Sequence, residues 1–257
     1  DSDINKWGWQ LEPHIGVLPD QEAMFITSSI KFDSPHGTTE ETWRKSLAWI
    51  DYGFQMAEKH NPKYIIVGSF DDTDERNGWI RVDTKEALPG WQMRDISGEI
   101  SIDAYYERIK SWIQNGFPPV IPGGILTDGG YMINTDDNRI LSIEDIKTPG
   151  SQVLTKEISY DIGDYFWFYH LGNNEYRIIK LNSGFSLEAS NTSVFHNWDK
   201  NENSQIWVVA DKGNNKFSFY NKENIKFLAW DIKSSKVYLS ENEHEVQTIW
   251  EIKPKIY

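Results

Sequence analysis

The sequence predicts an α+β protein of two domains, with an α/β segment at residues 1–120 and an all-β domain at residues 129–257. Two observations lead to this expectation. The first part alternates apolar, strand-like runs with amphipathic helical segments, whereas the last part repeats one pattern of short strands and turns three times. Between them, Pro118-Pro119 and Gly123-Gly124 indicate a linker, which we place at residues 121–128.

The first part reads as two strands and two helices in the order β-α-β-α. Thr38 is followed three residues later by a glutamate, a capping-box pattern that predicts the start of a helix. An unbroken apolar run such as Tyr64–Phe70 is typical of a strand buried on both faces. The expected elements are the strand Ala23–Thr27, a helix from Thr38 to His60, the strand Tyr64–Phe70 and a helix over Ile102–Trp112. This order predicts a parallel sheet with helical crossovers, of the kind found in a fragment of an α/β barrel.

The three repeats occupy residues 129–254 and share a tryptophan near the end of each copy. The copies open at Tyr131, Tyr176 and Phe217 and reach Trp167, Trp207 and Trp250. A unit of about 40 residues is too small to bury its own apolar face, so the copies must share a core. Three such units predict a β-trefoil, because a propeller usually needs four or more blades. We expect the three repeated tryptophans to be core residues.

The second repeat carries the most specific residue pattern. It contains Leu187-Glu188-Ala189, then His196-Asn197-Trp198, then Gln205-Ile206-Trp207. This order resembles the ricin-type, or Gln-x-Trp, β-trefoil lectin family. The glutamine is replaced by Tyr165 in repeat one and by Thr248 in repeat three. The resemblance covers about half of the chain, residues 129–254.

The resemblance implies a sugar site in repeat two. Glu188 would accept hydrogen bonds from two adjacent hydroxyls, although the family usually has Asp there, and Trp198 would stack on the C–H face of the sugar. Asn201 or Asn203, together with Gln205, would supply the amide contacts.

Repeats one and three lack the acid at the corresponding position, where they have Ser142 and Ala229. Acids do lie nearby, as Glu144 and Asp145 in repeat one and as Asp231 beside Trp230 in repeat three. Sugar binding by these two repeats therefore stays open.

An acidic cluster, Asp71–Glu75, follows the apolar run Tyr64–Phe70. Carboxylates at the end of a parallel strand raise one another's pKa, which suits the paired acid and base of glycoside hydrolysis. The run also resembles the Ser-Trp-Asn-Glu-x-x-Glu segment of endomannosidase-like glycoside hydrolases, which implies Asp72 and Glu75 as catalytic carboxylates. A complete barrel needs about 250 residues, so this part would be only the end of one, or a smaller α/β unit. A solvated acidic loop and a cation site are the alternatives.

Composition excludes several classes of function. The formal net charge of −13 repels phosphate backbones, so nucleic acid is not an expected partner. The chain has no cysteine, its 6 histidines show no metal-binding spacing, and no apolar run is long enough for a membrane span. We therefore expect no metal and no cofactor. The chain starts at Asp1 without a signal-like segment, which is typical of a processed or trimmed chain.

These observations favour carbohydrate binding by the trefoil, which would target a larger glycan-active or toxin-like protein to polysaccharide or cell-surface glycans outside the cell. One alternative is a glycoside hydrolase that uses the paired carboxylates, with the trefoil as an accessory module. Another is a trefoil that has lost sugar binding and contacts a protein instead. Whether the chain is an enzyme stays open.

Overall fold

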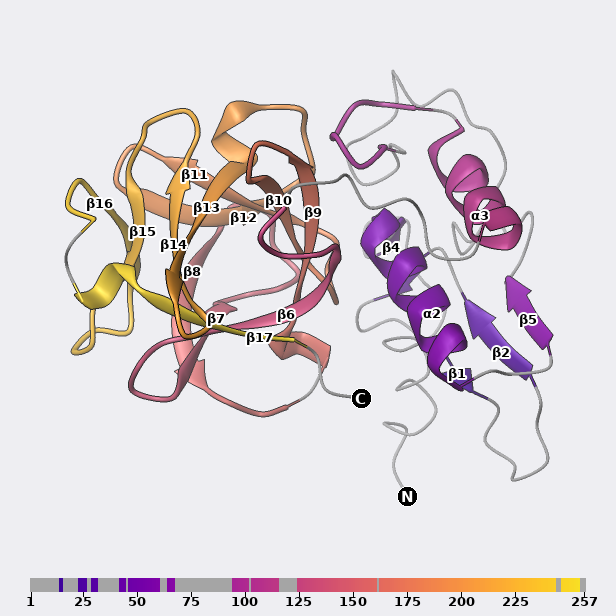
Figure 1. The fold of residues 1–257 in the computed structure, drawn as a ribbon, viewed down its shortest axis with the longest axis horizontal. Helices are drawn as coiled ribbons and strands as arrows, with labels where there is room; N and C mark the ends of the chain where they lie inside the picture. The colour runs from indigo at the N-terminus through magenta and orange to yellow at the C-terminus, as the bar shows by residue number, and fades with distance from the viewer. Residues whose placement is uncertain are drawn as a thin grey trace. The chain divides into compact units, whose positions relative to one another are not determined.

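The computed structural model describes residues 14–15, 23–26, 29–31, 42–44, 46–60, 64–67, 94–101, 103–115, 124–160, 162–243 and 246–254. The chain divides into two compact units (Figure 1). The first comprises Asp1–Asp95 and Glu99–Pro119, and the second comprises Ile96–Gly98 and Val120–Tyr257. The boundaries expected from the sequence, and the roles assigned to each part, stay predictions.

The predicted fold class, α+β with two domains, is wrong. The described residues are mostly β, because strands β6 to β17 form one 12-stranded sheet and the described α-helices are α2 and α3. The first unit does not have the all-parallel sheet of a barrel fragment either. In its sheet of order β1-β2-β5, strand β2 is parallel to β5 but antiparallel to β1. The expected likeness to the end of a hydrolase barrel therefore finds no support in this topology.

The first unit contains five short strands and two helices among its described residues. They are β1 (His14–Ile15), β2 (Ala23–Ile26), β3 (Ser29–Lys31), β4 (Thr42–Arg44), α2 (Leu47–His60), β5 (Tyr64–Val67) and α3 (Ala104–Asn115). The helix expected from Thr38 begins only at Leu47, because Thr42–Arg44 pairs with Ser29–Lys31 as a strand. The expected second helix is confirmed as α3. Asp72 and Glu75, the predicted catalytic carboxylates, lie outside the described residues.

Helices α2 and α3 are joined by one buried carboxylate. Asp51 on α2 accepts hydrogen bonds from Arg108 Nε at 2.7 Å and Nη2 at 2.8 Å. It also accepts one from Trp112 Nε1 at 2.7 Å. The ring of Trp112 stacks on Phe54 of α2 with a centroid distance of 5.2 Å. The helix pair is therefore held by both an ion pair and aromatic packing.

The second unit contains three consecutive sets of four strands. The first set is β6 (Gly129–Asn134), β7 (Arg139–Ile143), β8 (Ser151–Glu157) and β9 (Phe166–Gly172). The second set is β10 (Glu175–Lys180), β11 (Ser186–Ser190), β12 (Ser193–Asn197) and β13 (Ile206–Gly213). The third set is β14 (Lys216–Asn221), β15 (Phe227–Trp230), β16 (Val237–Ser240) and β17 (Trp250–Pro254). A short 3₁₀ helix precedes the last strand of each set: η3 (Ile162–Asp164), η4 (Asn203–Gln205) and η5 (Val246–Thr248).

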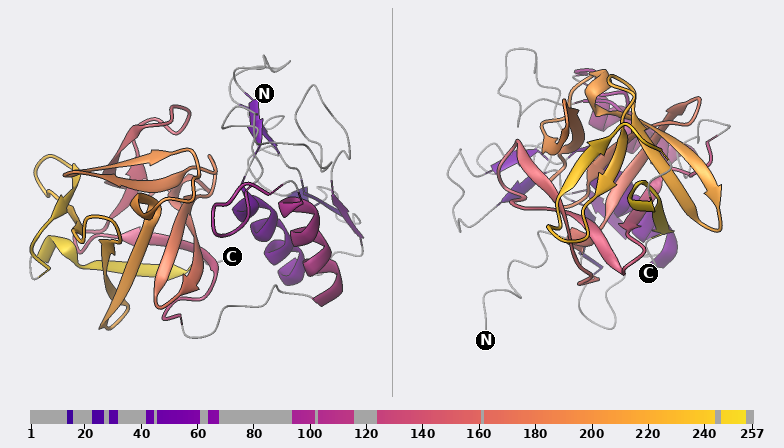
Figure 2. Two further views of the ribbon diagram at one scale, coloured as in Figure 1. Left: turned by 90° about the horizontal axis from the view of Figure 1, so that it is seen from above. Right: turned by 90° about the vertical axis from the view of Figure 1, so that its left-hand side faces the viewer.

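The strand pairing repeats with threefold symmetry. The outer strands of the sets pair in the order β6-β9-β10-β13-β14-β17 and return to β6, which closes a ring. The inner strands form three hairpins, β7–β8, β11–β12 and β15–β16. Strand β12 joins the hairpins by pairing with both β8 and β16. Two further views show the strands of this unit, coloured from pink to yellow, gathered in one body (Figure 2). A closed six-stranded ring with three hairpins is the arrangement of a β-trefoil.

The core of this unit is built from equivalent residues of the three repeats. The side chains of Trp167, Trp207 and Trp250 are fully buried, which confirms the prediction that they are core residues. The residue of repeat one that is equivalent to Trp207 and Trp250 is nevertheless Phe166, because it pairs with Tyr131 as Trp207 pairs with Tyr176 and Trp250 with Phe217. Trp207 Nε1 donates to the backbone oxygen of Leu187 at 2.9 Å, and Trp250 Nε1 makes the equivalent bond to Leu228. Each tryptophan of these two pairs therefore fastens the last strand of its repeat to the hairpin of the same repeat.

Asparagine turns connect successive repeats. Asn173-Asn174 links β9 to β10, and Asn214-Asn215 links β13 to β14, with positive φ at all four residues. Two consecutive positive φ values are the requirement of a type I′ hairpin turn, which Asn tolerates.

Neither described helix combines the length and the apolar character that a membrane-spanning helix requires.

Candidate functional site

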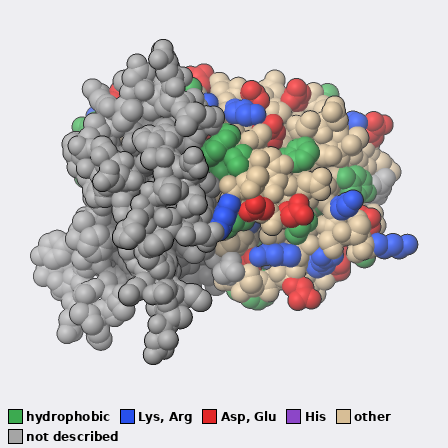
Figure 3. Space-filling view, turned by 180° about the vertical axis from the view of Figure 1, so that it is seen from behind, with side chains coloured by type: hydrophobic (Ala, Val, Ile, Leu, Met, Phe, Trp, Pro, Cys, Tyr) green, Lys and Arg blue, Asp and Glu red, His purple; other side chains and the backbone are tan. Residues whose placement is uncertain are grey.

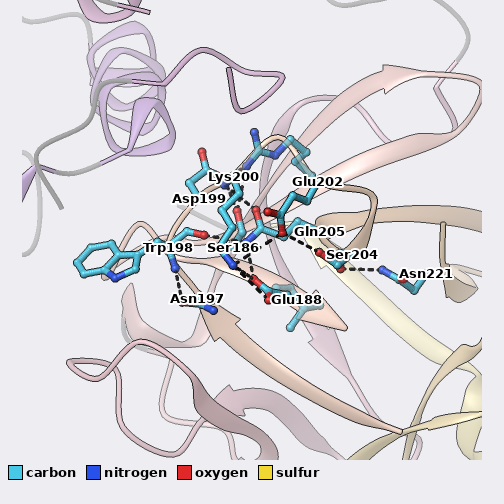
Figure 4. Close-up of polar contacts among 12 residues, drawn as sticks. Ser186, Glu188, Asn197, Trp198, Asp199, Lys200, Glu202, Ser204, Gln205 and Asn221 are labelled. Carbon is cyan, nitrogen blue, oxygen red and sulfur yellow. Dashed lines mark hydrogen bonds and ion pairs between the residues drawn. The ribbon is translucent and has the colours of Figure 1, made fainter. Parts of the chain in front are cut away.

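Gln205 is the centre of a polar cluster in repeat two. It ends the 3₁₀ helix η4 and is fully buried. Its Nε2 donates to Glu188 Oε2 at 2.8 Å and to the backbone oxygen of Trp198 at 2.7 Å. Its Oε1 accepts from the backbone N–H of Lys200 at 2.7 Å (Figure 4). Both ends of the amide are therefore used to bind the segment 198–200 to strand β11.

Glu188 lies in the middle of β11 and faces Lys200. Lys200 Nζ is 3.3 Å from Glu188 Oε2 and 3.4 Å from Oε1. The same ammonium lies 3.8 Å from Glu202 Oε2. The side chains of Glu188, Lys200 and Glu202 are 15%, 32% and 56% exposed, so the cluster opens progressively toward solvent. These contacts to Lys200 are long for charge-assisted hydrogen bonds and are therefore weak, so a ligand can compete with Lys200 for the carboxylate of Glu188.

The indole of Trp198 does not join this cluster. Its ring packs edge-on against Phe185 with a centroid distance of 4.6 Å. Figure 4 shows the ring directed away from Glu188, while the backbone of the same residue contacts Gln205. Asn201 and Asn203 are exposed in the same loop. Of the predicted site residues, the structure thus brings together Glu188, Gln205 and the main chain of Trp198.

A buried ion pair also holds the loop of residues 198–200. Arg177 of β10 pairs with Asp199 and also donates to Ser186 Oγ at 3.2 Å. The hydroxyl of Ser186 in turn donates to the Asp199 carboxylate. Arg177 is 1% exposed, so its charge is neutralised inside the protein by a residue of the loop. Residues 198–200 are therefore held at two points, by Gln205 and by Arg177.

In repeats one and three, the last residue of the 3₁₀ helix also forms a hydrogen bond with the loop that precedes this helix. In repeat one, Asp164 accepts from the backbone N–H of Ser159 at 2.7 Å. Burial acts to raise the pKa of Asp164, but hydrogen bonds from Lys156 and Ser159 outweigh it and lower the pKa. In repeat three, Thr248 Oγ1 donates to the backbone oxygen of Glu243 at 2.7 Å. Of these three fastening residues, Gln205 alone also binds an acid on the neighbouring hairpin.

The acid of repeat two has no counterpart in the other repeats. Ser142 and Ala229, which occupy the equivalent position, are 3% and 0% exposed. The nearby Asp145 accepts from Lys147 N at 2.9 Å and from Thr148 Oγ1, within a hairpin turn. Asp231 makes the equivalent bonds in its own turn. These aspartates are therefore used to shape turns.

Sequence reasoning missed Lys200 and the Arg177–Asp199 pair. Lys200 follows Glu188 by 12 positions, and its side chain meets the carboxylate because the loop folds back over β11. The only signal in the sequence was its place between Trp198 and Gln205.

Among the described residues, no group of three or more His, Asp or Glu side chains could hold a metal ion.

Comparison with known proteins gives similarities of fold only. No family model matches the chain, and no curated protein matches it. Similar solved structures include the designed threefold-symmetric protein ThreeFoil, at 18% identity and a TM-score of 0.45, covering 49% of this chain and 98% of ThreeFoil. The cytolethal distending toxin of Haemophilus ducreyi is 10% identical, with a TM-score of 0.45, 50% of this chain covered and 85% of the toxin chain.

The lectin of Polyporus squamosus, in complex with a human-type influenza-binding epitope, is 14% identical, with a TM-score of 0.43, 51% of this chain covered and 50% of the lectin chain. Each similarity covers about half of this chain. The threefold strand pairing, rather than these similarities, identifies the fold of the second unit as a β-trefoil.

Proposed function

We propose that this protein binds carbohydrate through repeat two, at a site built around Glu188. The observation that carries the proposal is the double use of Gln205, which fixes the carboxylate of Glu188 and the loop 198–200 in one place. A carboxylate fixed in this way is ready to accept hydrogen bonds from adjacent sugar hydroxyls without losing further side-chain freedom on binding. Repeat two alone among the three repeats has an acid at this position.

The neighbouring groups complete a polar surface suited to a sugar. Lys200 Nζ offers N–H donors to ring or hydroxyl oxygens beside the carboxylate acceptor. Asn201 and Asn203 are exposed residues of the same loop. Trp198 is half-buried against Phe185 and offers a partly exposed aromatic face at the end of the loop. In this proposal Glu188 and Lys200 make the polar contacts, and Trp198 adds an apolar edge.

The proposed role is to direct a larger glycan-active or toxin-like protein to polysaccharide or cell-surface glycans. It places the protein outside the cell, where such glycans are exposed. A binding module that is joined to an enzyme or a toxin raises the local concentration of that protein at the target glycan. The trefoil would therefore contribute affinity for a surface, and any catalytic step would lie elsewhere.

The experiment is a glycan array on the whole chain, with Glu188→Gln and Trp198→Ala as variants. Glu188→Gln keeps the shape of the side chain but removes the charge, and it should weaken binding about tenfold or more, because hydrogen bonds to charged groups are worth about 1.5–3 kcal/mol. Trp198→Ala should weaken it less, since the ring lies away from the carboxylate.

The matched control is Glu241→Gln in repeat three, which removes the same charge from a side chain that is 83% exposed. It should leave binding unchanged. Wild-type affinity in Glu188→Gln, or no glycan bound by any form of the protein, would contradict the proposal.

A further inference from the structure

The charges around Glu188 limit the class of glycan that the site can accept. Two carboxylates, Glu188 and Glu202, lie within 4 Å of the single ammonium of Lys200. Two negative charges and one positive charge leave a net charge of −1 at the opening of the cluster. Arg177 and Asp199, which hold the same loop, form an ion pair and cancel. We propose that the site selects neutral glycans and rejects glycans that carry carboxylate or sulfate groups; this inference rests on the proposed carbohydrate function.

The position of Lys200 explains why it does not act as an anchor for an anionic sugar. Its ammonium is shared between two acids, at 3.3 Å from Glu188 and 3.8 Å from Glu202. An anionic substituent would have to take the ammonium from both, and would then lie beside two uncompensated carboxylates. A neutral hydroxyl has no such conflict, because it can donate to Glu188 while it accepts from Lys200.

The rest of the chain does not offset this local charge. The formal net charge of the whole sequence is −13. On the face shown in Figure 3, acidic and basic side chains are interspersed over the described surface. Long-range attraction of an acidic glycan is therefore disfavoured as well.

Glu202 is the residue that tests this idea. It is the most exposed of the three charged side chains, and its carboxylate contacts Lys200 and, at 3.4 Å, Ser204 Oγ. Replacing it leaves the bonds of Gln205 to Glu188 in place. Glu202→Lys changes the local charge from −1 to +1, and the exposed Glu241→Lys in repeat three makes the same change in total charge far along the sequence.

The experiment measures binding of N-acetyllactosamine and its sialylated and sulfated forms, and of neutral xylan oligosaccharides and their glucuronic acid-substituted forms. We expect the wild-type chain to bind a neutral member at least about tenfold more tightly than its acidic partner, and this difference to shrink in high salt. Glu202→Lys should abolish or invert the preference, whereas Glu241→Lys should preserve it.

Equal binding of both members of a pair, or tighter binding of the acidic member, overturns the inference and leaves the proposed carbohydrate function standing. A preference that Glu202→Lys and Glu241→Lys change to the same extent also overturns it, because total charge would then be responsible. Absence of binding to every glycan on an array that also contains other neutral sugars overturns the proposed function, and the inference with it.

Discussion

His196 Nε2 lies 3.1 Å from the backbone oxygen of Asp145, so that a side chain of the hairpin β11–β12 contacts the turn of the hairpin β7–β8. The backbone makes a second link at the same place, where Gly150 N–H donates to the oxygen of His196 at 2.8 Å. A carbonyl oxygen only accepts, so Nε2 carries the proton of the neutral ring. The ring is fully buried and stacks on Phe185 at 4.8 Å. The junction of repeats one and two therefore depends on an uncharged histidine.

This junction predicts a loss of stability in mild acid. Burial lowers the pKa of His196 from 6.5 to about 3, with a further lowering by Lys180 and a small opposing effect of Asp145. The unfolded chain thus binds the proton more readily than the folded one, and stability is lost as pH falls below 6.5 toward 3. The slope should approach about 1.4 kcal/mol per pH unit in the free energy of unfolding. Urea unfolding at pH 7, 6, 5 and 4 measures it.

The control for the pH dependence is His196→Phe, which keeps an aromatic ring against Phe185. Its stability should be nearly constant between pH 6.5 and pH 4. The pKa values of Asp145, Asp164 and Asp231 are lowered from 3.8, so these carboxylates lose their contribution only at lower pH. An unchanged slope in His196→Phe would show that another group controls the acid response.

Gln205→Leu tests the centre of the candidate site as a structural element. The substitution has nearly the same size but leaves the backbone N–H of Lys200 and the backbone oxygen of Trp198 without their bonds. Each buried polar group left unsatisfied costs about 1–3 kcal/mol, so we expect the two together to lower the unfolding free energy by about 2–6 kcal/mol. Thr248→Val, which removes the hydrogen bond from Thr248 Oγ1 to the backbone oxygen of Glu243, should cost about 1 kcal/mol. An equal loss in both variants would contradict the assigned role of Gln205.

The trefoil was predictable because its signals are local and repeated. Trp207 and Trp250 occupy equivalent positions and are fully buried, and in repeat one Phe166, the neighbour of the predicted Trp167, takes that position. The start of α2 was not predictable from the same kind of signal. The capping-box pattern at Thr38 is local, but pairing of Trp43 with Ile30 places that segment in a strand. The fold class failed for a different reason, since the strands β6 to β17 dominate the described residues while α2 and α3 are their α-helices.

The candidate site was predictable only in part. Glu188 and Gln205 came from a resemblance to a family pattern, and the structure joins them by a hydrogen bond. The ring of Trp198 was expected beside the acid, yet it packs on Phe185 instead. Lys200 was not predicted, because its contact with Glu188 depends on the path of the loop between β12 and β13. The assignment of any of these residues to sugar binding stays a prediction.

Asp51 provides a test in the first unit. It is 1% exposed and pairs with Arg108, whose side chain is 14% exposed. Removing one partner of a buried ion pair leaves the other charge uncompensated and costs about 3–5 kcal/mol. Asp51→Asn should therefore destabilise the packing of α2 on α3 by about 3 kcal/mol, even though the amide can still accept from Trp112. The double variant with Arg108→Gln should be less destabilised than the sum of the single variants, as measured by a double-mutant cycle. Additive losses would show that the two side chains do not stabilise each other.

Ile225 is the clearest case of backbone strain in the trefoil. It follows β14 in a turn, with φ of +56° and a side chain that is 69% exposed. The equivalent turns of repeats one and two have Asn138 and Gly184 at this position, with φ of +64° and +77°. Asn and Gly tolerate this conformation, whereas a β-branched residue is strained there by about 1 kcal/mol or more. We expect Ile225→Gly to raise the free energy of unfolding by about 1 kcal/mol, as the strain is relieved and little burial is lost.

The control for Ile225→Gly is Ile232→Gly. Ile232 is 50% exposed and lies in a turn in which the positive φ falls on Ser235 and not on Ile232, so the same substitution should be neutral or destabilising there. Thermal and urea unfolding of the two variants beside the wild-type chain separate the effects. If both substitutions stabilise the protein, exposure of an apolar side chain, and not the backbone conformation, accounts for the gain. If Ile225→Gly destabilises it, then the Ile225 side chain makes contacts whose stabilising effect exceeds the strain of its backbone.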